Sequence, residues 1–382
     1  MNAKRTIIQE SVRHDNVLGP RALNRALLAR QFLIERTRLP VGEVLEHLIG
    51  LQSQAPNPPY FGLWTRLKDF TQESLSQLLL NRQAVRIALM RSTIFLVTSR
   101  DCLTLRPLVQ PVLDRGLKGN YGKYLNGIDL HAAGAYGRRL VEEKPLTFSE
   151  MGQLLQEQWP DCDPSALSAV VRTLVPLVQT PPRGIWGSSG QAVHTSAVSW
   201  IGSPLASEGT LESLVTRYLR AFGPASISDV QVWSGLTQLR KVMERLRPHL
   251  CTFVDDNGIE LFDVPGGERP DVDTPVPVRF LAEFDNMLLS YKDRTRIIAD
   301  DYRKRVFTVN GIIKATILID GFVQGLWRIK CKGSTATLII EPFQLISQSV
   351  KDELTVEGER LLLFAEPDAT VRDIQFVAGD PT

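Results

Sequence analysis

Apolar side chains recur at helical spacing through the N-terminal two thirds of the chain. One apolar stripe begins after Pro20 and a second begins after Pro40, and each predicts an amphipathic helix. The proline-rich segment 55–59 cannot continue the second helix, so this helix is predicted to end near residues 52–54. Further elements are predicted downstream: helices over 61–67, 73–90 and 103–113, and a strand over 94–97. Helices followed by a strand are typical of a winged helix, which we place at residues 1–140.

Two later segments repeat this order of elements loosely. Residues 145–202 contain a capped helix start at 146–150, followed by a helix over 165–175 and strands over 177–179 and 185–186. Residues 208–264 contain a helix over 239–246 and the turn Asp255-Asp256-Asn257-Gly258, which is a strong hairpin signal. The repeated order predicts two more winged-helix modules, with a glycine-rich loop at 116–127 before the first of them.

The C-terminal part of the chain has a different pattern. A linker rich in proline and aspartate covers residues 264–278. Clusters of β-formers then predict strands, and a last apolar stripe predicts a closing helix: strands over 280–289, 306–309, 315–319, 323–329 and 336–340, and a helix over 350–364. The predicted fold is therefore α+β, with tandem winged-helix modules and a β-barrel-like C-terminal domain at residues 278–382.

Composition excludes several classes of protein. The 382 residues are 43% hydrophobic and 23% charged, which is typical of globular proteins of several modules. The sequence starts without a signal peptide and contains no membrane-length apolar run, so we expect a cytoplasmic protein associated with the nucleoid. The four cysteines lie at least 60 positions apart and the five histidines are scattered, so we expect no metal and no nucleotide cofactor.

The net charge of +2 conceals a local pattern. Residues 1–100 hold 14 basic and 7 acidic residues, and residues 301–350 hold 7 and 3. Between them, residues 251–300 hold 5 basic and 11 acidic residues. Two basic regions that flank an acidic one are compatible with phosphate contacts, although chance clustering on a solvated surface produces similar sums.

Three stretches carry a resemblance to a known family: GLQSQAPNPPYFGLW at 50–64, ALMRSTIFLV at 88–97 and FLAEFDNMLL at 280–289. They resemble the winged-helix DNA glycosylases typified by AlkZ, and residues 319–327 and 340–343 are similar to the same family. The resemblance implies three winged helices held in a C shape by a C-terminal β-domain. It also implies removal of bulky N7-alkylated guanines and unhooking of interstrand crosslinks, in double-stranded DNA, by a protein that we expect to be a monomer.

The resemblance assigns the catalytic signature to Gln52 and Gln54. This chain departs from the family pattern at Ser53, where an apolar residue is usual, and at Phe95, where many relatives carry histidine. A glutamine amide accepts and orients a water but is no strong base, so the pair suits a substrate whose leaving group is already cationic. Side chains two residues apart converge only on extended backbone, because on a helix they point about 200° apart.

DNA contacts are predicted at basic positions and at the Asp320-Gly321 hairpin turn, which would enter the minor groove with Phe322 as a wedge. The predicted DNA-binding residues are Arg21, Arg25, Arg91, Thr93, Arg294, Arg296, Asp320, Gly321, Phe322, Arg328 and Lys330. A plain barrel hairpin and a solvated strand face are the alternatives for these residues.

Two alternatives stand beside the glycosylase interpretation. From the residues alone, Gln52 continues the apolar stripe and caps a helix end, while Gln54 bonds loop backbone. For the whole protein the alternative is a non-catalytic winged-helix DNA-binding protein or transcriptional regulator, since winged helices more often bind DNA than act on it chemically.

Overall fold

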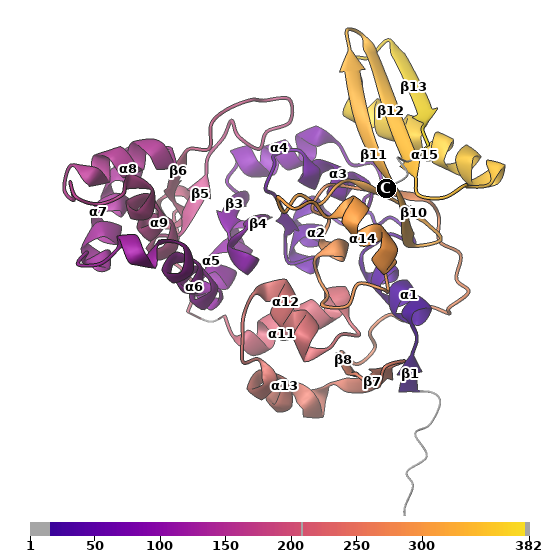
Figure 1. Cartoon of the computed structure of the whole chain (residues 1–382), viewed down its shortest axis with the longest axis horizontal. Helices are drawn as coiled ribbons and strands as arrows, with labels where there is room; N and C mark the ends of the chain where they lie inside the picture. The colour runs from indigo at the N-terminus through magenta and orange to yellow at the C-terminus, as the bar shows by residue number, and fades with distance from the viewer. Residues whose placement is uncertain (1–15, 208, 379–382) are drawn as a thin grey trace, which may run out of the picture.

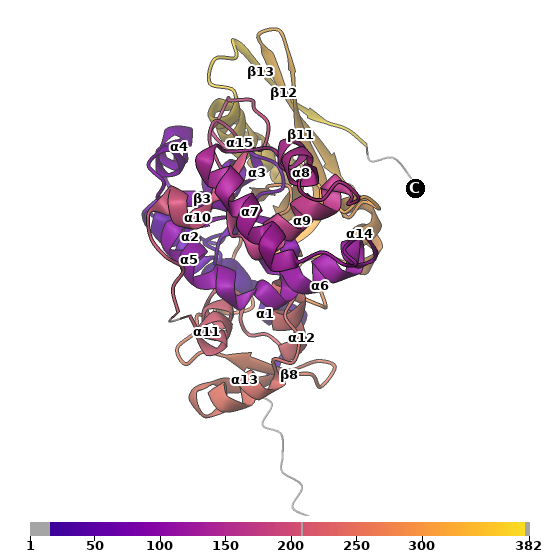
Figure 2. The same ribbon diagram turned by 90° about the vertical axis from the view of Figure 1, so that its left-hand side faces the viewer.

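The protein is described here from a computed structural model, which covers residues 16–207 and 209–378. Its helices and three β-sheets form four regions in chain order (Figure 1). Two perpendicular views agree that the C-terminal sheet and the third region lie at opposite ends, with the first region between them (Figures 1 and 2). None of the described helices is long and apolar enough to cross a membrane.

The first region is mostly helical, and helices begin at Pro20 and after Pro40, where the apolar stripes of the sequence predict them. Its elements are α1 (Pro20–Arg30), α2 (Val41–His47), β2 (Leu51–Gln52), α3 (Pro58–Trp64), α4 (Gln72–Leu80), β3 (Ala84–Ala88), β4 (Ile94–Thr98), α5 (Ser99–Leu108) and α6 (Gln110–Tyr121). Short 3-10 turns follow β3 at Met90–Ser92 and α6 at Gly122–Tyr124.

The second region shares a sheet with the first. It consists of α7 (Leu130–Glu143), α8 (Phe148–Gln156), α9 (Pro164–Leu174), β5 (Leu177–Gln179), β6 (His194–Ser196) and α10 (Ala197–Ile201). Because β5 pairs with β3 through Arg86 and Gln179, the strands follow the order β2-β4-β3-β5-β6. One sheet therefore spans the segments 1–140 and 145–202 that the sequence predicts as separate modules.

The third region is smaller and recruits a strand from the start of the described chain. It contains α11 (Leu211–Phe222), α12 (Ile227–Ser234), α13 (Arg240–Leu246), β7 (Cys251–Asp255) and β8 (Glu260–Asp263). The two strands flank the predicted Asp255–Gly258 turn, and β1 (Val17–Leu18) adds to β7 in parallel. The sequence does not reveal this pairing, because its two partners lie more than 230 positions apart.

The C-terminal region is an open sheet covered by one long helix. Its elements are β9 (Arg279–Leu281), α14 (Asp300–Val306), β10 (Thr316–Ile319), β11 (Phe322–Lys332), β12 (Thr335–Pro342), α15 (Gln348–Ala365) and β13 (Val371–Phe376). The strand order is β13-β12-β11-β10-β9, with β9 and β13 at the edges, so the sheet does not close in the described residues. The β-barrel prediction is wrong, because α15 buries Leu354 and Leu361 against one face and closure is not needed to cover it.

Five predicted elements differ from the structure, because apolar periodicity and turn signals are ambiguous over short runs. One of them, the predicted strand 306–309, is the end of α14 followed by an isolated bridge and a turn. The predicted helix 73–90 ends at Leu80 and gives way to β3, whose residues are all buried. The predicted loop 116–127 is mostly the end of α6, and the predicted strand 280–289 is β9 followed by a 3-10 turn. The second strand of the hairpin in the second region is 194–196, not 185–186.

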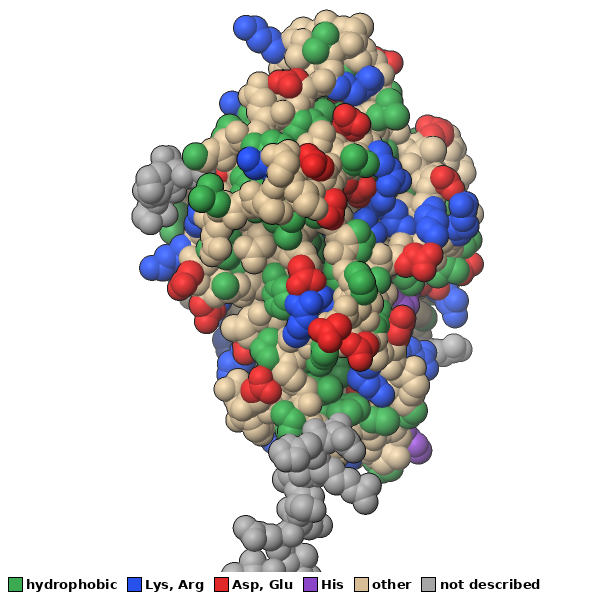
Figure 3. Space-filling view, turned by 90° about the vertical axis from the view of Figure 1, so that its right-hand side faces the viewer, with side chains coloured by type: hydrophobic (Ala, Val, Ile, Leu, Met, Phe, Trp, Pro, Cys, Tyr) green, Lys and Arg blue, Asp and Glu red, His purple; other side chains and the backbone are tan. Residues whose placement is uncertain are grey.

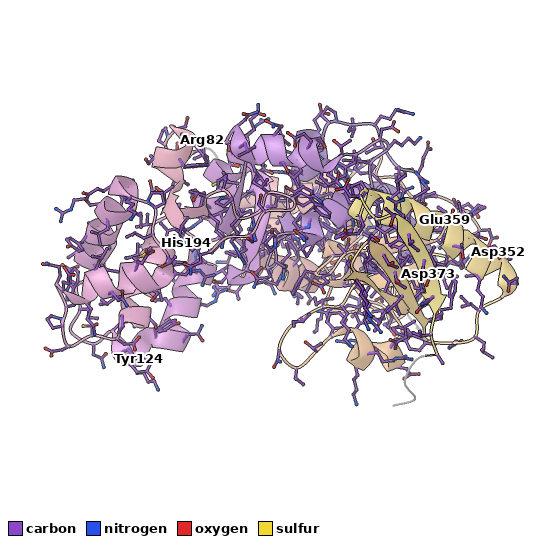
Figure 4. The ribbon with its side chains drawn as sticks, turned by 90° about the horizontal axis from the view of Figure 1, so that it is seen from above. Arg82, Tyr124, His194, Asp352, Glu359 and Asp373 are labelled. Atoms are coloured by element: carbon purple, nitrogen blue, oxygen red, sulfur yellow. The ribbon has the colours of Figure 1, made fainter. Side chains whose placement is uncertain are left out.

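His194 of β6 makes the stability of the second region dependent on pH. Its Nδ1 donates to Leu146 O (3.4 Å), and its ring stacks on Phe148 with the ring centroids 4.1 Å apart. His194 lies inside the second region, whereas Tyr124 lies at the outer edge of the molecule (Figure 4). Burial lowers the pKa of His194 from 6.5 to about 4, so the neutral ring favours folding. The stabilisation is present above pH 6.5 and is lost as the pH falls toward 4.

When the pH is lowered from 7 to 5, the free energy of unfolding should therefore fall in both proteins by different amounts. We expect the fall to be about 2 kcal/mol larger in the wild type than in His194→Phe. Phenylalanine keeps the stacking partner of Phe148 but has no proton to gain. Urea unfolding of both proteins at the two pH values measures the difference. Parallel pH profiles would show that His194 does not titrate during unfolding.

Candidate functional site

Gln52 ends strand β2 at the edge of the shared sheet, and Ser53 and Gln54 follow it into a bend. Gln52 pairs with Phe95 of β4, and the Ser53 N–H donates to Ile94 O at 2.7 Å. The predicted helix end at 52–54 is wrong, because α2 ends at His47 and the chain then turns into β2. Both glutamine amides reach the segment 91–94, Gln52 through the Arg91 side chain and Gln54 through the backbone of Ile94.

Each glutamine amide is held through its carbonyl oxygen. Gln52 Oε1 accepts from Arg91 Nη2 at 2.8 Å, and the Gln52 side chain keeps 7% exposure. Gln54 is exposed, and its Oε1 accepts from the backbone N–H of Ile94 at 2.9 Å. Guanidinium and backbone N–H groups only donate, so the chemistry of the two partners fixes which end of each amide is the oxygen.

Ser53 is buried and is held by Arg86 of β3. Arg86 Nε donates to Ser53 Oγ at 3.0 Å, and Arg86 Nη2 donates to Ser53 O at 2.7 Å. Both residues are almost wholly buried, and burial lowers the pKa of Arg86 to about 10. The serine at this position therefore supplies a hydrogen-bond acceptor to a buried guanidinium, which an apolar side chain could not do.

Asn286 supports the same strand from the C-terminal region, and the sequence analysis missed it. Its Oδ1 accepts from Gln52 N at 3.4 Å and its Nδ2 donates to Gly50 O at 2.7 Å. The neighbouring Asp285 forms a buried pair with Arg66 of the first region. The signal in the sequence was a pair of polar residues inside the apolar run 280–289, which buried strands rarely carry without a partner.

Arg91 lies where all four regions meet. It belongs to the turn between β3 and β4, lies 5.4 Å from the Phe95 ring centroid, and donates to Trp233 O at the end of α12. From α9, Arg172 donates to Ser92 O at 2.8 Å. Burial, together with repulsion from Arg294 of the C-terminal region, lowers the pKa of Arg91 to about 10.

The arginines around Gln52 have no acidic partner, a property that they share with the buried Arg106 and Arg296. Four other buried guanidiniums pair with carboxylates: Arg25 with Asp320, Arg30 with Asp263, Arg36 with Glu357 and Arg66 with Asp285. Among the described residues, no carboxylate lies within 4.0 Å of Arg86, Arg91, Arg172 or Arg294. Positive charge near the two glutamines is therefore uncompensated, which favours an anionic partner.

The Asp320-Gly321 turn is not free to enter a groove. Arg21 Nη1 lies 2.6 Å from Asp320 Oδ2, the buried Arg25 also pairs with Asp320, and Asn24 Nδ2 donates to Gly321 O at 2.8 Å. The turn is thus packed on α1. These ion pairs occupy Arg21 and Arg25 within the protein, and DNA contact by these two arginines, by Asp320 and Gly321 and by Phe322 as a wedge stays a prediction.

The remaining predicted DNA-binding residues separate into buried and exposed sets. Arg296 is buried, donates to Pro224 O at 2.8 Å and lies over the Tyr291 ring, so its assignment to a phosphate-binding rim is wrong. Thr93 uses its hydroxyl to donate to Met90 O at 3.0 Å within the β3–β4 turn. Arg328 and Lys330 are exposed on β11, and their contact with DNA stays a prediction.

Comparisons with known proteins identify the family of this chain. A family model described as "DNA glycosylase AlkZ-like" matches residues 45–364. The chain belongs to the AlkZ-like DNA glycosylase family. The resemblance drawn from the sequence is confirmed, and so is the assignment to a family of enzymes.

Two individual relatives of the AlkZ-like chain come from Streptomyces sahachiroi. The chain is 25% identical over 355 residues to an interstrand DNA cross-link repair glycosylase, covering 83% of this chain and 88% of the relative. The solved structure of the DNA glycosylase AlkZ superposes with a TM-score of 0.77 at 19% identity, covering 94% of this chain and all of that one. The AlkZ-like match contains both glutamines and Arg91, whereas Arg21 and Arg25 precede it.

Proposed function

We propose that this AlkZ-like protein removes bulky N7-alkylated guanines from double-stranded DNA and unhooks interstrand crosslinks. Gln52 and Gln54 position the water that replaces the base. The proposal places DNA on three winged-helix modules, at 1–140, 145–202 and 208–264, joined by the C-terminal β-domain at 278–382. The name of the Streptomyces sahachiroi relative, an interstrand cross-link repair glycosylase, supports the choice of substrate.

The observation that carries the proposal is the position of the two glutamines. At the edge of the shared sheet Gln52 bonds Arg91 and Gln54 bonds the backbone of Ile94, and neither Arg91 nor the nearby Arg86 and Arg172 has an acidic partner among the described residues. Unpaired positive charge attracts the DNA backbone, while the amides make neutral hydrogen bonds at its centre. The face seen in Figure 3 carries acidic and basic side chains intermixed.

Amide side chains suffice for this reaction because the substrate is already activated. When the C1′–N9 bond breaks, its electron pair neutralises the cationic N7-alkylguanine, so no acid is needed. A water oxygen adds to C1′ of the oxocarbenium-like sugar and its proton passes to solvent. An amide side chain can form a hydrogen bond with this water and hold it over the sugar, and positioning of this kind lowers the barrier.

The decisive experiment measures release of N7-methylguanine, and of a crosslink-derived adduct, from duplex DNA. We expect Gln52→Ala and Gln54→Ala each to lower the release rate by roughly tenfold to a hundredfold with unchanged DNA affinity. Gln375→Ala is the matched control, since Gln375 is an exposed strand glutamine of β13 with one side-chain hydrogen bond. Binding without release by the wild type would favour a regulator, and full activity of the variants would refute the roles of the glutamines.

A further inference from the structure

We propose that Arg91 is a positioning residue that fixes the Gln52 amide with its NH2 group toward the substrate. The inference rests on the proposed function and adds to it a direction for the hydrogen bond. In this arrangement Gln52 Nε2 donates to one lone pair of the water oxygen, and the second lone pair of that oxygen attacks C1′.

The amide orientation follows from the partners of the two carbonyl oxygens. Arg91 Nη2 occupies Gln52 Oε1 and the Ile94 N–H occupies Gln54 Oε1. Among the described residues, neither Gln52 Nε2 nor Gln54 Nε2 has a hydrogen-bond partner within the protein. A rotated Gln52 amide would place two donors against each other and leave a buried guanidinium without its acceptor, which costs about 1–3 kcal/mol or more.

Arg91 is itself held so that it can only face Gln52. Its guanidinium also donates to Trp233 O and lies near the ring of Phe95, the position where many relatives carry histidine. Arg91 and Ser92 have φ values of 55° and 59°, a backbone conformation that residues other than glycine rarely adopt. Strain of this kind persists where the surrounding contacts require it, here to direct Arg91 back into the fold instead of toward DNA.

A cationic donor also changes the chemistry of the amide. Charge-assisted hydrogen bonds are about twice as strong as neutral ones, and donation to Oε1 polarises the amide so that its N–H groups become better donors. Gln52 is then a weak acceptor and a strong donor. A donor locates the water over C1′ without activating it, which is sufficient when the leaving base is already cationic.

The test compares Arg91→Met, Arg91→Lys and Gln52→Glu with the wild type and Gln52→Ala. Single-turnover release of N7-methylguanine and DNA affinity at several salt concentrations are measured for each protein. The control is Arg82→Met, because Arg82 likewise donates to a carbonyl (Trp200 O, 3.1 Å) and lies over a ring, but on the outer surface (Figure 4). We expect Arg91→Met to lower the release rate about tenfold with unchanged affinity and salt dependence, and Arg91→Lys to recover part of it.

Gln52→Glu tests the direction of the hydrogen bond even if Arg91→Met fails to fold. Glutamate keeps the bond to Arg91 but replaces the outward NH2 by an oxygen, so we expect activity as low as in Gln52→Ala. Retained or increased release of N7-methylguanine by Gln52→Glu would overturn the donor role of Gln52. Weaker DNA binding with a shallower salt dependence in Arg91→Met would show that Arg91 contacts a phosphate instead. In either case Gln52→Ala separately decides whether the proposed function stands.

Discussion

Replacing Asp285 by asparagine is expected to lower the free energy of unfolding by about 3–5 kcal/mol, because it leaves the buried Arg66 guanidinium without its counter-charge. The two side chains are 1% and 0% exposed, and they form two hydrogen bonds of 2.8 and 2.9 Å. Asp285 also accepts from Met287 N, which holds the 3-10 turn after β9. The loss therefore loosens the contact between the first and C-terminal regions.

The matched control for this prediction is Asp69→Asn. Arg38 and Asp69 form an ion pair of similar length, 2.7 Å, but their side chains are 74% and 76% exposed. Water screens such a pair, so we expect a cost of less than about 1 kcal/mol. Urea unfolding of the three proteins measures both effects, and equal costs in the two variants would show that burial of the Arg66–Asp285 pair does not matter.

The resemblance to a family identifies the two glutamines, whereas their conformation does not follow from the local sequence. The Pro-rich segment after Gln54 predicts a helix end near 52–54, but the helix ends at His47, and the strand that carries Gln52 pairs with β4. Its partner residue, Phe95, lies 43 positions away. Strand pairing over such a distance is set by tertiary contacts, which single-sequence patterns do not contain.

The contacts of individual arginines are also not predictable from local sequence patterns. A basic residue at helical spacing looks the same in sequence whether it faces phosphate or a distant carboxylate. Arg25 forms an ion pair with Asp320, which lies 295 positions away in the sequence. Arg91 adopts a backbone conformation with positive φ that no local sequence motif predicts. The exposed Arg328 and Lys330 show that composition predicts surface charge better than it predicts the contacts of individual guanidiniums.

Gly50→Ala is expected to damage both the stability and the activity of the protein, because Gly50 sets the position of Gln52. Its φ is 82°, and an added Cβ would lie 2.5 Å from Val97 Cγ1 and 2.7 Å from Leu96 O. Both atoms belong to β4, the strand that pairs with β2, so the contact can be relieved only by moving the two strands apart. Overpacking and the unfavourable φ together should cost about 2–4 kcal/mol.

Separation of the strands also displaces Gln52 from Arg91, and a shift of about 1 Å is enough to lower the rate by on the order of a hundredfold. We therefore expect Gly50→Ala to release N7-methylguanine up to a hundredfold more slowly, at a temperature where the variant is still folded. Gly202→Ala isolates the backbone contribution, because Gly202 has a φ of 78° with no atom within 4 Å of the added Cβ, and should cost about 1 kcal/mol with full activity. Full activity of folded Gly50→Ala would mean that the Gln52 amide tolerates displacement. The position that β2 gives to Gln52 would then not explain the role of Gln52 in base release.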